Sequence, residues 1–144
     1  YNWGIALDGW ASTKSGSDAD ELFKQAGEKY AEAVKIKSDD YGTFDNWGAM
    51  LLHWYRNIAV ELKDNILKQA KDVLLQGETI KKGSASYNLA CACALSDQED
   101  ECLQWLTHSK DSGGLPTKEH LQQDTDLDSV RNKKWFIEFI NKLE

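Results

Sequence analysis

Hydrophobic residues recur along this chain at spacings of three and four, which is the period of an amphipathic helix. Leu22, Ala26 and Tyr30 lie on one such face, and the stretches 43–58 and 60–76 repeat the pattern. Polar, glycine-containing segments interrupt it at residues 12–18 (STKSGSD) and 38–42 (SDDYG). The pattern therefore predicts helices nearly throughout, arranged in consecutive pairs.

Short motifs predict where several helices begin and end. Ser17 with Asp20, and Ser96 with Glu99, have the spacing of capping boxes, in which a side chain at each end bonds an unpaired backbone N–H. Gly77 follows an apolar helical run and is expected to be a C-cap.

The C-terminal part of the chain has a different pattern. A third helix pair is predicted at about 85–95 and 97–109, and the segment SGGLP (112–116) ends it. A short helix near 117–123, an Asp-rich turn and a terminal amphipathic helix follow. That last helix carries an apolar stripe of Trp135, Phe136, Phe139, Ile140 and Leu143. Such a segment is expected to cap the open side of a repeat array, whose terminal unit lacks a neighbour.

A three-residue motif repeats at nearly regular distances. Asn-Trp-Gly occurs at residues 2–4 and 46–48, and Asn-Leu-Ala follows at 88–90. The asparagines are 46 − 2 = 44 and 88 − 46 = 42 residues apart, a period typical of stacked helical repeats. We expect one domain with repeats at about 1–40, 41–82 and 83–116 and a cap at 117–144.

The repeats resemble those of the tetratricopeptide repeat (TPR) family, with its pattern W-x-x-L-G-x-x-Y followed by A-x-x-x-F and Pro. The first-helix places hold Trp3, Gly4 and Leu7; Phe44, Trp47, Gly48 and Leu51; and Ser86, Leu89, Ala90 and Cys93. The second-helix places hold Ala26, Tyr30 and Ala33, with Ser38 in the usual proline position, and Cys102 and Leu106. The tail DTDLDSVRNKKWFIEFI is similar to a segment that closes many bacterial and organellar TPR proteins. The first two units exceed the family's 34 residues, by roughly 10 residues each.

The resemblance implies an all-α fold: a right-handed superhelical array of antiparallel helix pairs with a C-terminal capping helix. Trp3, Trp47 and Leu89 are then core residues, and Gly4, Gly48 and Ala90 lie where helices approach closely.

The resemblance also implies a concave groove in which Asn2, Asn46 and Asn88 bond the backbone of an extended peptide. The alternative is that these asparagines make only local hydrogen bonds. The candidate groove residues are Tyr1, Asn2, Ile5, Asp45, Asn46, Ala49, His53, Tyr87, Asn88 and Cys91. The family's clamp for a C-terminal carboxylate is not expected, because Asp45 would repel that anion.

Net charge and the groove residues limit the kinds of partner that we expect. The chain has a formal net charge of −7, which disfavours nucleic acid and anionic membrane surfaces. A mixed apolar and acidic groove fits a polypeptide with basic or apolar side chains. We therefore expect a non-catalytic interaction module, a scaffold or adaptor. The alternative is a regulatory or assembly-factor domain that docks on an enzyme or complex subunit through its convex face or its cap.

No residue pattern indicates catalysis, a cofactor or a metal. Asp124, Asp126 and Asp128 alternate as in a calcium loop, but Ser129 and Trp135 stand where that loop needs Gly and Glu. Asp126 is instead expected to cap the next helix, and Arg131 to pair with a nearby acid. Cys91 and Cys93 point apart on a helix and are unsuited to sharing one ion. His53, His108 and His120 have no partner at metal or nucleophile spacing.

The cysteines and the chain's start suggest where the protein works. Cys91, Cys93 and Cys102 are expected to be small, free core residues of a protein in a reducing intracellular compartment, cytoplasmic or organellar. No apolar run is long enough to cross a bilayer. Tyr1 opens the chain without an initiator Met, so we expect it to be a piece of a longer protein.

Overall fold

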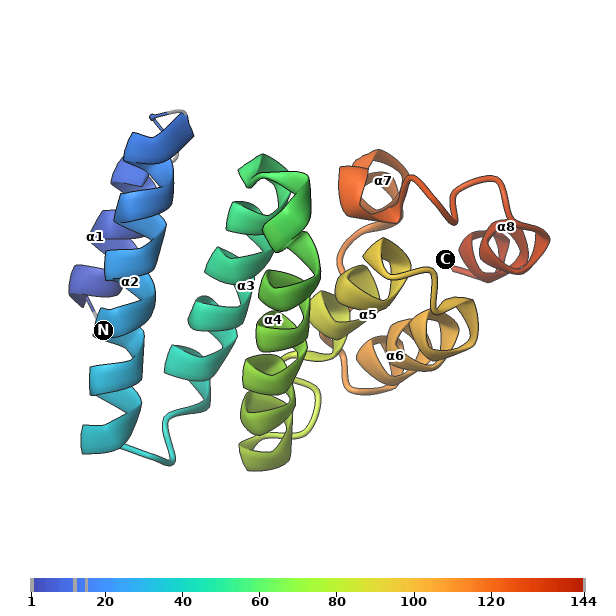
Figure 1. Cartoon of the computed structure of the whole chain (residues 1–144). Coiled ribbons are helices and arrows are strands. Elements are labelled where there is room, and N and C mark those ends of the chain that lie inside the picture. Colours follow the sequence, from blue (N-terminus) through green and yellow to red (C-terminus); the bar gives the residue numbers. More distant parts are fainter. Residues whose placement is uncertain (1, 12, 15, 144) are drawn as a thin grey trace. The chain divides into compact units, whose positions relative to one another are not determined.

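The structure is a computed structural model that describes residues 2–11, 13–14 and 16–143; the side chains of residues 2 and 3 lie outside this description. Helices account for its secondary structure, and no strand occurs among these residues (Figure 1). The elements are α1 (Asn2–Ala11), α2 (Gly16–Ile36), α3 (Tyr41–Asn57), α4 (Val60–Ile80), α5 (Ser86–Leu95), α6 (Glu99–Asp111), α7 (Lys118–Gln123), the 3-10 turn η1 (Thr125–Leu127) and α8 (Lys134–Asn141). The all-α prediction is confirmed, and the chain divides into two compact units, residues 1–81 and 82–144.

The first unit consists of two helix hairpins. α1 packs on α2, and α3 packs on α4; α2 also packs on α3, and α1 contacts α3. The apolar faces predicted from helical spacing meet in its core, whose buried members include Phe23, Ala26, Tyr30, Met50, Leu51, Leu52, Ala70 and Leu74. Burying one such large side chain is worth about 1.5–3 kcal/mol, so these faces hold the four helices together.

Glycines allow the helices of the first unit to approach closely. A Cβ atom at Gly4 would lie 2.9 Å from Cζ of Tyr30, and one at Gly48 would overlap the side chain of Leu74. The predicted close approach at both glycines is therefore confirmed.

The C-cap prediction for Gly77 is wrong: α4 continues to Ile80, and a Cβ at Gly77 would overlap the Asp45 carboxylate. Gly77 allows α4 to pack against α3.

Both predicted capping boxes are also wrong. Ser17 lies inside α2, which begins at Gly16, and the Asp20 carboxylate instead accepts a hydrogen bond from Trp54 Nε1 at 2.8 Å. Ser96 is the C-cap of α5, and its hydroxyl donates to the Ala92 carbonyl at 2.8 Å. The residue before α6 is Gln98, which makes no side-chain cap. A four-residue motif cannot decide between the end of one helix and the start of the next when a short turn separates them.

The second unit is built around α5, which packs on α6 and on η1. Its buried apolar side chains include Leu89, Ala90, Ala92, Cys93, Cys102, Leu106, Leu121, Leu127, Val130, Phe136 and Ile140. Leu89, Ala90 and the three cysteines are buried, as predicted. Trp47, a predicted core residue of the first unit, is only half-buried, although its Nε1 atom is enclosed.

The terminal helix buries part of its predicted apolar stripe. Phe136 and Ile140 are buried, whereas Trp135, Phe139 and Leu143 are half-buried. Glu99, at the start of α6, holds the beginning of α8: it accepts from Trp135 Nε1 at 2.9 Å and pairs with Lys133 Nζ at 2.9 Å. The C-terminal segment is thereby attached to the α5–α6 hairpin.

Candidate functional site

Predicted groove residues of the first unit come from α1 and α3, which contact each other. Ile5 on α1 is 43% exposed, and Ala49 on α3 is also exposed. Asp45 and Asn46 on α3 are half-buried, and the predicted Asn2 side chain lies outside the described part of the chain, as does Tyr1. With His53 of α3, five of the predicted residues therefore lie on two neighbouring helices.

His53 links these two helices. Its Nδ1 atom lies 3.2 Å from Oδ1 of Asp8 on α1, and its ring packs edge-on against Phe23 with centroids 5.2 Å apart. Asp8 was missed by the sequence analysis; it lies one turn after Ile5 on α1, so the two share a helix face. The α1–α3 surface, defined by Ile5, Asp8, Ala49 and His53, is thus apolar and acidic in character.

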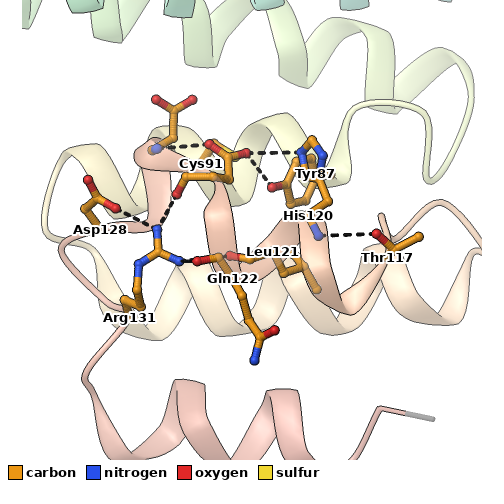
Figure 2. Close-up of polar contacts among 10 residues, drawn as sticks. Tyr87, Cys91, Thr117, His120, Leu121, Gln122, Asp128 and Arg131 are labelled. Atoms are coloured by element: carbon orange, nitrogen blue, oxygen red, sulfur yellow. Dashed lines mark hydrogen bonds and ion pairs between the residues drawn. The ribbon is translucent and has the colours of Figure 1, made fainter.

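Tyr87 and Cys91 of α5 face the C-terminal segment. The Tyr87 hydroxyl donates to Oδ2 of Asp124 at 2.5 Å, and the Cys91 thiol faces the same oxygen at 3.9 Å (Figure 2). Cys91 is only 2% exposed and so does not contribute to an open surface in this structure. Tyr87 and Asn88 are half-buried.

Asp124 organises the turn between α7 and η1. Its Oδ1 accepts from the Asp126 backbone N–H at 3.0 Å and caps η1, which is the role predicted for Asp126. Asp126 lies within η1 and is buried, so that prediction is wrong. Asp124 is also 3.5 Å from His120 Nε2, one helical turn earlier. Together Tyr87, Cys91, His120, Asp124 and Asp126 form what we call the Asp124 cluster.

Arg131 fixes the same turn from the other side. Its guanidinium donates to the carbonyls of Leu121, Gln122 and Asp124 and to the Asp128 carboxylate, the last at 2.6 Å (Figure 2). The predicted pairing of Arg131 with a nearby acid is confirmed. These carbonyls end α7, so the arginine supplies the hydrogen bonds that the helix end leaves unmade.

Burial and charge keep the donors of the Asp124 cluster protonated. The pKa of Cys91 is raised well above its usual value of 9.0, first by burial and then by the charges of Asp124 and Asp126. The pKa of Tyr87 is likewise raised, mainly by burial and also by Cys91 and by its hydrogen bond to Asp124. In this environment the raised pKa favours the neutral thiol of Cys91 over the nucleophilic thiolate.

The Asp124 cluster also contains a possible set of metal ligands. The Cys91 Sγ atom and one carboxylate oxygen each from Asp124 and Asp126 all lie within 4.8 Å of one another. No sequence motif joins these ligands, because Cys91 and Asp124 are 33 positions apart in the chain. Cys93, as expected, points elsewhere: its Sγ faces Glu101 at 3.9 Å.

In the second unit Ser86 is bonded to His108, but burial keeps the Ser86 hydroxyl from acting as a nucleophile. Ser86 Oγ lies 2.8 Å from His108 Nδ1, but Ser86 has no exposed surface. A buried hydroxyl cannot reach a substrate, so this bond joins the start of α5 to α6.

Comparison with family models, with curated proteins and with solved structures gives no match. Within the part of the chain that the structure describes, no helix combines the length and apolar character needed to span a membrane.

Proposed function

We propose that this chain is a non-catalytic interaction module of the TPR type, a scaffold or adaptor that binds an extended polypeptide along the α1–α3 surface. The repeat motifs and the consecutive helix hairpins support this assignment. The proposal includes a right-handed superhelical course of the helix pairs, with the first helix of each pair lining the groove.

The observation that carries the proposal is the side-by-side placement of α1 and α3 with their predicted groove residues. The Asp8–His53 contact brings the two helices together next to exposed Ile5 and Ala49. Exposed apolar positions favour apolar side chains of a peptide, and the Asp8 carboxylate favours basic ones. Asn46 on α3 carries a side-chain amide, a group that can both donate to and accept from the backbone of an extended chain.

The test is selection of peptides from a phage-displayed random library on the purified chain. We expect selected peptides to be rich in basic and apolar residues and to lose binding at least tenfold to an Ala49→Arg variant. Ala49 is an exposed helix position where arginine is well tolerated by the fold, so the variant should remain folded. Ile36→Arg makes the same charge change at another exposed helical position, outside the α1–α3 surface, and should bind like the parent.

Equal binding by the parent and the Ala49→Arg variant would contradict the location of the groove. A library that yields no binder for the parent chain would contradict peptide recognition itself.

A second candidate is a regulatory or assembly-factor domain that docks through another face. A shallow groove of about 340 Å³, lined by Ser38, Phe44, Leu75, Gln76, Thr79 and Ile80, favours it, and Ile36 nearby in the chain is 87% exposed. Apolar surface of this kind is a common feature of protein interfaces. Loss of partner binding in Leu75→Glu, with Ala49→Arg unaffected, would select this candidate.

The proposal assigns no catalytic residue and no cofactor to peptide recognition. It places the protein in a reducing intracellular compartment, because three buried thiols would be retained there.

A further inference from the structure

We propose that the Asp124 cluster is a binding site for a divalent metal ion of the zinc class, with Cys91, Asp124, Asp126 and His120 as ligands. This inference is independent of peptide binding, because it rests on side chains of the second unit alone.

The proposed ligands come from neighbouring elements of the second unit. Cys91 lies in α5, His120 in α7, Asp124 between α7 and η1, and Asp126 within η1. The Cys91 sulfur is 3.9 Å from Asp124 Oδ2, and the three Cys and Asp ligand atoms lie within 4.8 Å of one another. Ligand atoms around a tetrahedral zinc ion are about 3.5 Å apart, so movements of roughly an ångström would bring the Cys91, Asp124 and Asp126 ligand atoms around one ion. His120 is close to Asp124 alone, so its ring must also turn toward the ion.

His120 supplies the fourth ligand and the route from solvent. Its Nε2 atom is 3.5 Å from Asp124 Oδ2, and its side chain is 56% exposed. The ring packs edge-on against Tyr87 with centroids 5.8 Å apart, which orients the imidazole toward the cluster (Figure 2). An ion can therefore enter past His120, while Cys91 and Asp126 form the buried side of the site.

The residues around the cluster already fix its ligands. Tyr87 donates to the Asp124 carboxylate at 2.5 Å, and Arg131 Nη2 donates to the Asp124 backbone carbonyl at 2.6 Å. Hydrogen bonds of this type orient ligands and hold them before an ion arrives. The Cys91 thiol and the His120 imidazole face the same carboxylate oxygen of Asp124.

The ligand chemistry selects the kind of ion. Sulfur and imidazole ligands beside carboxylates suit zinc and related transition metals, whereas calcium and magnesium take oxygen ligands. On binding, the Cys91 S–H bond breaks, its proton leaves to solvent, and a sulfur–metal bond forms. The three anionic ligands offset the two positive charges of the ion.

The test uses Co²⁺ added to the chelator-treated full chain, followed by competition with Zn²⁺. Cobalt in a tetrahedral site with a cysteine ligand gives a thiolate-to-metal charge-transfer band in its absorption spectrum. We expect this band in the parent chain, its loss in Cys91→Ser, and its retention in Cys93→Ser. Cys93 is the matched control, because it is equally buried on the same helix but faces Glu101.

Two further variants keep the proposal falsifiable if Cys91→Ser does not fold. His120→Ala changes an exposed side chain and should weaken Zn²⁺ binding at least tenfold. Tyr87→Phe removes a hydrogen bond to a ligand and should weaken it by about 10–100-fold. The absence of a charge-transfer band in the parent, the same band in folded Cys91→Ser, or unchanged Zn²⁺ affinity in His120→Ala would each overturn the proposed site.

Discussion

At the residue scale, Asp124 shows how one carboxylate connects three segments of the second unit. Its Oδ1 caps η1, and its Oδ2 accepts from Tyr87 on α5 and lies near His120 on α7. The sequence showed an Asp-rich turn but not its partner, because the contact with Tyr87 joins residues 37 positions apart. A local motif can indicate a cap, whereas a contact at that distance depends on how the helices pack.

Removing the Tyr87 hydroxyl should show how much its hydrogen bond to Asp124 contributes to stability. In Tyr87→Phe the Asp124 carboxylate loses a donor in a partly buried place, which should lower the free energy of unfolding by about 1–3 kcal/mol. Denaturant titration measures the change. Tyr41→Phe is the control: its hydroxyl is on an exposed side chain, bonded to Lys81, and the loss should stay within about 0.5 kcal/mol. Equal effects in the two variants would contradict the account.

Two glycines make a second matched pair at this scale. Gly48→Ala should destabilise the first unit by about 1–3 kcal/mol, because the added methyl overlaps Leu74 in a packed core. Gly9→Ala on α1 meets nothing within 4 Å and should stabilise the helix by about 0.5–1 kcal/mol. Thermal melts compare both with the parent. A neutral Gly48→Ala would show that α3 and α4 can move apart at no cost.

At the element scale, helical spacing identified the helices but not all of their ends. The periods of α2, α3 and α4 are long and regular, and the corresponding helices occur. Gly77 resembled a stop signal, yet it lies opposite Asp45 and Phe44, where only a glycine leaves room. The residues next to Gly77 do not reveal this neighbour, because the contact depends on how α3 packs against α4. The residues next to Ser96 do not reveal that it ends α5, because that depends on the length of the turn before α6.

The attachment of α8 should depend on pH. Lys133 and Trp135 hold the pKa of Glu99 below its usual value of 4.5 through their hydrogen bonds. Because this pKa is lower in the folded chain, the contact stabilises the fold above the usual pKa, and its contribution is lost as pH falls through the lowered value. We expect the indole N–H resonance of Trp135 to shift in NMR spectra as pH falls below about 4.5.

The matched control for this titration is Glu99→Gln. It removes the titrating group but keeps an acceptor for Trp135, so the acid shift should be absent. A Trp135 resonance that titrates in the same way in Glu99→Gln would show that another group controls the start of α8.

Deleting residues 117–144 should disrupt the second unit. The deletion removes the buried side chains of Leu121, Leu127, Val130, Phe136 and Ile140. Each is worth about 1.5–3 kcal/mol when buried, and their removal exposes the apolar surface of α5. We expect loss of cooperative unfolding or aggregation, measured by circular dichroism and light scattering. A shortened chain that melts like the parent would mean that the segment is dispensable for folding.

At the scale of the whole molecule, the sequence predicted an all-α chain of helix pairs with a different C-terminal segment, and the described helices agree with that plan. It also placed Ile5, Asp45, Asn46, Ala49 and His53 on helices that prove to be α1 and α3. It did not group Cys91 with Asp124 and Asp126, because this cluster forms only when η1 folds against α5. The repeated motifs predict the packing that the helix pairs have in common. The Asp124 cluster instead depends on where the non-repeated C-terminal segment packs.

The most direct test of the central claim is an NMR titration of the ¹⁵N-labelled chain with a selected peptide. Peptide binding along the α1–α3 surface predicts the largest backbone shifts at Ile5, Asp8, Ala49 and His53. It also predicts that Asn46→Ala weakens binding by about 1–3 kcal/mol, the cost of leaving a peptide group unpaired. Shifts confined to the groove of Phe44, Leu75 and Ile80 or to α8, with Asn46→Ala binding like the parent, would contradict it.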